Sequence, residues 1–179
     1  MSIYQIDPAH SSAQFKVRHM MIANVKGEFD KVSGTVIYDP ANPGAAKVEA
    51  TIDVASVSTR DEQRDTHLKS ADFFDVEKFP NITFKSKKVT ATGGDNFTVV
   101  GDLAIHGVTK EVELKVEELT EQTKDPWGNL RRGASAQTRI NRKDFGMTFN
   151  MALDTGGFMV GDVVDLTIDV ELTQPGQAA

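Results

Sequence analysis

Strict alternation of apolar and polar residues near the end of the chain constrains its fold more than any other feature. Between positions 164 and 173 every second residue is apolar, and the residues between them are Asp, Thr or Glu. Successive side chains of a β-strand point to opposite faces, so the pattern predicts a strand with one buried face and one wet face. Similar or related strand patterns occur at 12–19, 26–39, 48–54, 82–89, 99–105 and 112–116.

Turn sequences separate these predicted strands. His106-Gly107 suits a tight hairpin, because glycine adopts positive φ without steric cost. Gly, Pro, Asp and Asn predict further turns at 39–44, 93–96 and 125–128. About eight strands result, near the number that closes a barrel wide enough for side chains or one ligand. We therefore expect an all-β fold, an eight-stranded antiparallel barrel, in a single domain over residues 1–174 with a frayed tail at 175–179.

One segment departs from the strand pattern. Thr59 is followed three residues later by Glu62, which is the spacing of a capping box with Thr59 as N-cap. The residues that follow favour a helix to about Ala71, and Phe79-Pro80 lies beyond its end. The sequence thus predicts a short helical insertion around residues 59–71.

Composition excludes several classes of protein and site. The formal net charge of -6 argues against a nucleic-acid partner and against docking on anionic lipid surfaces. The absence of cysteine excludes disulfides and thiolate chemistry. The segment 1–8 lacks the basic and apolar regions of a signal peptide, and no apolar run is long enough to cross a bilayer. We expect no stable membrane insertion and a cytoplasmic location, or a periplasmic one if a leader was removed.

The sequence contains few signals of catalysis. Its histidines show no local pairing of the kind that zinc sites use, and they are His10, His19, His67 and His106. No nucleophile elbow or P-loop is present, so neither a metal nor a cofactor is predicted. Asp65 and His67 lie close together in the predicted helix, where a carboxylate can orient an imidazole. An equally good interpretation is a structural hydrogen bond that pins the helix to the barrel.

Long, soft side chains gather near position 149. Met147, Phe149 and Met151 alternate with polar residues, and Phe145 and Phe158 flank them. Methionine suits surfaces that must fit an irregular apolar guest. Core packing explains any one of these residues, but the set as a whole favours the lining of a barrel interior.

A basic group stands out in an acidic chain, and its members are Arg131, Arg132, Arg139, Arg142 and Lys143. Arginine can clamp an anionic head group in a bidentate manner, or it can protect strand edges and form surface pairs. We expect surface roles for Arg131 and Arg132. Arg142 is the better candidate for a head-group site, because residues 141–146 resemble a strand end that re-enters the barrel.

Five ordered motifs resemble those of the YceI-like family. They lie at 11–20 with 27–29, at 64–75, 79–86, 101–110 and 141–146, and so span nearly the whole chain. The resemblance implies an extended, lipocalin-like, eight-stranded barrel. It also implies a homodimer and a long amphiphile in the interior, such as a polyisoprenoid or a fatty amide or acid.

Two functions of different class follow. The favoured one is non-enzymatic binding, storage or transport of a polyisoprenoid, of the isoprenoid quinone or prenyl phosphate type, with its head near His67, Asp65 or Arg142 at the mouth. The alternative is a lipid-modifying barrel enzyme that uses Asp65 and His67 as an acid/base pair. The candidate ligand-binding residues are Phe15, His19, Phe29, Asp65, His67, Phe74, Arg142, Phe145, Met147, Phe149 and Met151.

Overall fold

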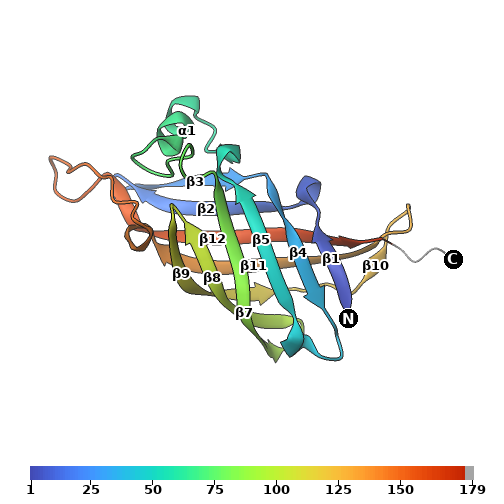
Figure 1. Ribbon diagram of the computed structural model, residues 1–179. Coiled ribbons are helices and arrows are strands. Elements are labelled where there is room, and N and C mark those ends of the chain that lie inside the picture. The colour runs from blue at the N-terminus through green and yellow to red at the C-terminus, as the bar shows by residue number, and fades with distance from the viewer. Residues whose placement is uncertain (176–179) are drawn as a thin grey trace.

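The computed structural model describes residues 1–175, and the strands in this range form one antiparallel sheet (Figure 1). Their bounds are β1 (Ser2–Ile6), β2 (Ser12–His19), β3 (Ala23–Phe29), β4 (Val32–Tyr38), β5 (Lys47–Asp53), β6 (Val57–Ser58), β7 (Asn81–Gly93), β8 (Asn96–Ile105), β9 (Val108–Glu117), β10 (Thr123–Lys124), β11 (Leu130–Asn141) and β12 (Val160–Gln174).

Eight strands of the described chain close into a barrel, as expected. They follow the order β11-β9-β8-β7-β5-β4-β1-β12, and β12 pairs back with β11 along the whole length of β11. The strands β2, β3 and β6 extend this wall, because β2 pairs with residues 160–169 of β12 while β1 pairs with residues 172 and 173. The N-terminal segment therefore lies along β12 in two pieces, with a short helix between them.

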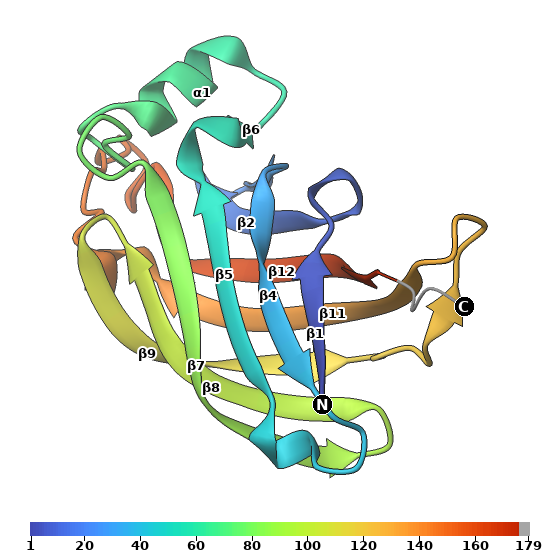
Figure 2. The ribbon, with the colours of Figure 1, turned by 45° about the vertical axis from the view of Figure 1, so that its right-hand side comes forward.

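The helical elements of residues 1–175 are all short. The 3-10 helices are η1 (Pro8–His10), η2 (Pro43–Ala45), η3 (Val54–Ser56) and η4 (Arg142–Phe145), and the α-helix is α1 (Glu62–Lys69). Within this range no helix has both the length and the apolar character needed to span a membrane. The helix α1 lies over one end of the barrel, above the ends of β5 and β7 (Figure 2).

The helical insertion is confirmed, but the predicted N-cap is wrong. The N-cap is Asp61, whose carboxylate accepts a hydrogen bond from the Arg64 N–H at 3.0 Å. Arg60 has a left-handed φ of 62° and turns the chain between Thr59 and the helix. Thr59 is thereby left behind in a buried position, 5% exposed, where it binds Asp65.

The predicted turns at 93–96, 106–107 and 125–128 join β7 to β8, β8 to β9 and β10 to β11. The single strand expected at 26–39 is interrupted, because residues up to Phe29 pair with β2 and β6 whereas residues from Val32 pair with β1 and β5. At the other end of the chain β12 continues to Gln174. From residue 176 onward, the tail expected to fray lies outside the described residues.

Candidate ligand-binding cavity

The barrel contains a cavity of about 340 Å³. Its wall is built from inward-facing side chains of all eight barrel strands, because alternation sends every second residue of each strand to the interior. Nearly all of these side chains are aliphatic or aromatic. The volume lies in the range of small-molecule sites, roughly 300–1,000 Å³.

The inner face of β11 shows how the wall makes room for a guest. The residues that it contributes to the cavity are Arg132, Ala134, Ala136, Thr138, Ile140 and Arg142. Small side chains occupy the middle of this row, and an arginine stands at each end. A strand rises about 3.3 Å per residue, so the two arginine backbones are roughly 33 Å apart.

Three aromatic side chains meet at the end of the barrel beneath α1. His67 lies 5.1 Å from Phe73 and 5.0 Å from Phe149 between ring centroids, and the two phenylalanines are 5.2 Å apart. The three rings line the cavity and connect α1, the turn after it and the loop before β12. We call this end, with its three rings, the helix end of the cavity.

The opposite end of the cavity is crossed by residues 118–122. The Leu119 N–H donates to the Asp95 carbonyl at 3.2 Å, and the Thr120 N–H donates to the Gly133 carbonyl at 2.9 Å. Gln122 Nε2 reaches the hydroxyl of Tyr4 at 2.8 Å. The segment is thus bonded to the β7–β8 turn, to β11 and to β1, and we call this end the capped end.

Arg142 is only 3% exposed and donates hydrogen bonds to backbone carbonyls of the loop before β12 and of the first residues of β12. Nη1 donates to the carbonyls of Met147 and Phe149, both at 2.8 Å, and Nε donates to that of Gly161 at 2.8 Å. Burial lowers the pKa of the guanidinium, and the nearby charge of Asp162, 3.6 Å from Nη2, opposes this shift. The side chain therefore holds the loop in place. The N–H donors that do so are the ones that a lipid head group would need.

Asp65 and His67 do not form the pair that sequence proximity suggested. Asp65 Oδ1 accepts hydrogen bonds from the Thr59 N–H at 2.8 Å and from the Thr59 hydroxyl at 2.6 Å, which pins α1 to the strand before it. His67 Nε2 instead lies 2.8 Å from Oδ2 of Asp72. The structural interpretation of Asp65 is thus correct, and the orienting carboxylate of His67 is a residue that the sequence had not singled out.

Most of the candidate residues line the cavity, namely Phe15, His19, Phe29, His67, Phe74, Arg142, Met147 and Phe149. Three candidates lie elsewhere. Asp65 is hydrogen-bonded to Thr59, Phe145 is the last residue of η4 and is buried at 2% exposure, and Met151 is 55% exposed in the loop before β12. The alternation of Met147, Phe149 and Met151 carries no strand periodicity, because the loop from Gly146 to Met159 lies outside the named strands.

Among the charged residues of the cavity wall, the sequence pointed only to Arg142, and the surface role expected for Arg132 is wrong. Within the described chain these charged residues are Arg18, Arg64, Arg132 and Arg142, with no Asp or Glu among the lining residues. Arg132 lies opposite Leu172 in the β11–β12 pairing, and directly opposed residues share a face. Arg132 therefore points inward like Leu172, an inference that requires knowledge of the pairing between β11 and β12.

The hairpin between β2 and β3 carries an exposed apolar tip made of Met20, Met21 and Ile22. Met20 and Met21 have φ values of 50° and 60°, and the Ile22 N–H donates to the His19 carbonyl at 3.2 Å. These are features of a tight hairpin turn that usually contains Asn and Gly. The Met20 N–H also donates to the Met159 carbonyl at 2.7 Å, so the tip is joined to the loop before β12.

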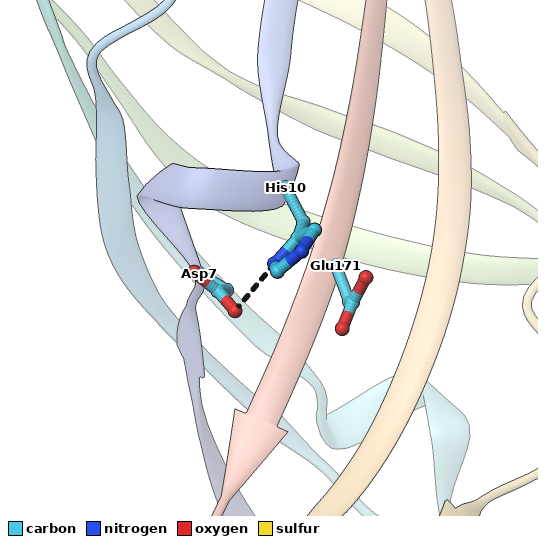
Figure 3. A group of neighbouring side chains, drawn as sticks. All are labelled: Asp7, His10 and Glu171. Carbon is cyan, nitrogen blue, oxygen red and sulfur yellow. Dashed lines mark hydrogen bonds and ion pairs between the residues drawn. The ribbon is translucent and has the colours of Figure 1, made fainter. Parts of the chain in front are cut away.

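Asp7, His10 and Glu171 cluster on the outside of the barrel (Figure 3). A divalent ion can use one histidine and two carboxylates. Here the Nη1 group of Arg131 donates to both Asp7 and Glu171, while Nε donates to Asp125 at 2.7 Å. Arg131 supplies the positive charge at the centre, and the cluster fits an ion-pair network that ties η1, β11 and β12 together.

The comparisons with known proteins agree with this architecture. Residues 4–172 match the YceI-like domain family. A UPF0312 protein of Staphylococcus aureus (strain N315) is 40% identical over 174 residues, which cover 97% of this chain and 98% of the relative. One of Vibrio cholerae is 41% identical over 146 residues, 80% of this chain and 77% of the relative.

Solved structures share the fold. BcnA of Burkholderia cenocepacia has a TM-score of 0.79 at 26% identity, covering 93% of this chain and 98% of BcnA. The Campylobacter jejuni YCEI protein has a TM-score of 0.72 at 34% identity, covering 88% and 89%. A polyisoprenoid binding domain from Saccharophagus degradans has a TM-score of 0.68 at 16% identity, covering 96% and 98%, which is a likeness of fold alone. On the family match and these identities, the chain belongs to the YceI-like domain family.

Proposed function

We propose that this protein is a non-enzymatic carrier or store of a long-chain amphiphile, of the polyisoprenoid type, that lies inside the barrel. The observation that carries the proposal is the apolar cavity enclosed by the eight strands. A polyisoprenoid is the favoured class, since the neighbour from Saccharophagus degradans is described as a polyisoprenoid binding domain and shares the fold.

The physical basis of binding is removal of the lipid tail from water. Each buried CH₂ contributes roughly 0.8 kcal/mol. The two alanines in the middle of the inner row of β11 and the aliphatic side chains of β12 give the tail a wall with few polar groups to desolvate. Tight binding therefore needs few specific contacts along the tail.

The enzymatic alternative requires Asp65 and His67 to act as an acid/base pair, but the two side chains have different hydrogen-bond partners. Asp65 is bonded to Thr59, and His67 is bonded to Asp72 at the exposed rim of the helix end. Asp65 is therefore not the carboxylate that is bonded to the imidazole of His67. The His67–Asp72 hydrogen bond links α1 to the turn after it.

The test compares two variants that place the same side chain on opposite faces of β11. Ala136→Phe fills the cavity, whereas Gln137→Phe adds a ring to the exposed outer face. Organic extracts of purified wild type and Gln137→Phe should contain a long-chain amphiphile, identified by mass spectrometry, and Ala136→Phe should hold much less. Equal lipid content in both variants, with both folded by circular dichroism, would contradict the proposal.

The proposal extends to assembly and location. We expect a homodimer, as the YceI-like resemblance implies, and light scattering of the purified protein should give twice the mass of one chain. We also expect the carrier in the cytoplasm, which cell fractionation tests. A monomeric mass would contradict the homodimer, and recovery in the periplasmic fraction would contradict the cytoplasmic location. Neither result would bear on lipid binding.

A further inference from the structure

We propose that the cavity binds amphiphiles with an anionic head, a phosphate or a carboxylate, and that the head lies at Arg132 in the capped end while the tail extends toward α1. The inference rests on the proposed lipid-carrier function and specifies its ligand. It moves the head-group site from Arg142, at the helix end, to the other end of the same strand.

Arg132 has hydrogen-bond donors that the protein does not use. A guanidinium carries five N–H donors and stays charged. Arg132 donates from Nε to the Tyr4 hydroxyl at 3.2 Å and from Nη1 to the Thr120 carbonyl at 2.7 Å. Its other donors, those of Nη2 among them, have no acceptor within the described residues. They are available to an oxygen of a guest.

The positive charge of Arg132 also favours an anionic guest. Arg132 is half-buried, and no carboxylate of residues 1–175 forms an ion pair with it. Its guanidinium lies 5.4 Å from the ring centre of Tyr38, which also lines the cavity. A charge that is partly removed from water is stabilised by an opposite charge, and an aromatic face replaces only part of that stabilisation. The site therefore selects an anion.

The other arginines of the wall are less suited to this role. Arg142 uses its donors on backbone carbonyls. Arg64 donates to the hydroxyl of Thr59, which in turn donates to the carboxylate of Asp65, so an acid stands next to its charge. Arg18 is exposed, and water solvates its charge.

The surroundings of Arg132 fit a head that continues into an apolar tail. The next inward residues of β11 are Ala134 and Ala136, which leave space along the wall. Phe97, Leu119 and Val116 complete an apolar lining near the cap. The strand between Arg132 and the helix end gives the tail roughly 33 Å of wall.

The affinity test uses ligands that differ only in the head. Geranylgeranyl phosphate is compared with geranylgeraniol, and palmitate with hexadecanol, by displacement of a fluorescent lipid. Wild type should prefer the anionic member of each pair, and Arg132→Gln should lose about tenfold to a hundredfold in affinity for that member with little change for the alcohol. A phosphate preference without a carboxylate preference would identify the head as a phosphate, and the reverse as a carboxylate.

Arg139→Gln is the matched control, because Arg139 lies on the same strand but faces outward and pairs with Asp165. It should bind all four ligands like wild type. If Arg64→Gln or Arg18→Gln abolishes the preference for anions while Arg132→Gln keeps it, the head lies at the helix end and the inference is wrong. Equal binding of alcohols and anions by wild type overturns the inference but leaves the carrier function standing. Binding of none of the four overturns the carrier function itself.

Orientation is measured separately from affinity. The Trp127→Phe background removes the single tryptophan, and Phe97→Trp or Phe73→Trp places a new one near the capped end or the helix end. Stearate with a nitroxide near its carboxylate should quench the first tryptophan more, and stearate with a nitroxide near its methyl end should quench the second more. The opposite pattern would place the head beneath α1.

Discussion

Arg142 holds Phe149 in place through the backbone: its Nη1 donates to the Phe149 carbonyl at 2.8 Å, and the ring of Phe149 contacts His67 at the helix end. A buried arginine that donates to several carbonyls can set the path of a loop. The position of the ring at the helix end thus depends on a side chain seven residues earlier.

We expect Arg142→Ala to lower the free energy of unfolding by about 2–4 kcal/mol, because buried carbonyls left without a donor cost about 1–3 kcal/mol each. Denaturant unfolding measures the loss, and hydrogen exchange should show faster exchange in residues 146–160. Lys143→Ala is the control, since Lys143 is exposed and its partner is Asp162 at 3.2 Å. Its effect should stay within about 1 kcal/mol. Similar losses in both variants would show that Arg142 does not organise the loop.

The N-terminus of α1 gives a second prediction. Asp61→Ala should destabilise the protein by about 0.5–2 kcal/mol, because its carboxylate accepts from the Arg64 N–H. Asp61→Asn keeps an acceptor at the cap and should stay close to wild type. Exchange of the Arg64 amide, followed by NMR, should accelerate in the alanine variant alone. Equal acceleration in both variants would mean that the side chain does not cap the helix.

The barrel could be predicted because the alternation of apolar and polar residues in each strand, and the residue types of each tight turn, are visible in the local sequence. The long run at 164–173 and the His106-Gly107 turn both needed only neighbouring residues. The cap of α1 was misplaced because the left-handed φ of Arg60 is a backbone feature that Thr59 and Glu62 do not reveal.

The roles of Arg132 and Arg142 depend on how strands pair with one another. The sequence of a single strand does not reveal this pairing. The inner row of β11 is only weakly apolar, because alanine, threonine and two arginines occupy most of it. The pairing with Leu172 fixes which face of β11 points inward. The hydrogen bonds of Arg142 to the loop before β12 and to the start of β12 likewise join residues that lie up to nineteen positions apart.

The Arg131 network gives an acid-dependent prediction. The Arg131 guanidinium lowers the pKa of Asp7 from 3.8 to about 2, and it does the same to Asp125. A carboxyl whose pKa is lower in the folded state adds stability above its unfolded pKa and loses it as the pH falls. Wild type should therefore lose stability between about pH 4 and pH 2. Arg131→Met should start less stable and lose less over this window, as urea midpoints at each pH would show. Parallel curves would rule out the network as the source.

His10 gives the opposite sign in a different window. Its hydrogen bond to Asp7, at 3.0 Å, raises the pKa of the imidazole above 6.5. Such a group contributes fully below its unfolded pKa, and the contribution is lost as the pH rises through the folded pKa. Wild type should lose a little stability above about pH 6.5, and His10→Asn should lose none from this source. NMR titration of the His10 ring checks the pKa directly, and an ordinary value would remove the prediction.

The β2–β3 turn is strained by its own sequence. Met20 and Met21 both have positive φ, which costs a residue with a Cβ about 1–2 kcal/mol. Met20→Asn combined with Met21→Gly supplies the residues that this turn favours, so we expect a gain of about 1 kcal/mol in the free energy of unfolding. The gain is smaller than the full strain, because Met21 also packs against Gly157. Met20→Ala with Met21→Ala removes both long side chains but keeps the strained backbone, and it should give no gain. A gain of the same size in the alanine pair would mean that the exposed methionine side chains, and not the left-handed backbone, limit stability at this tip.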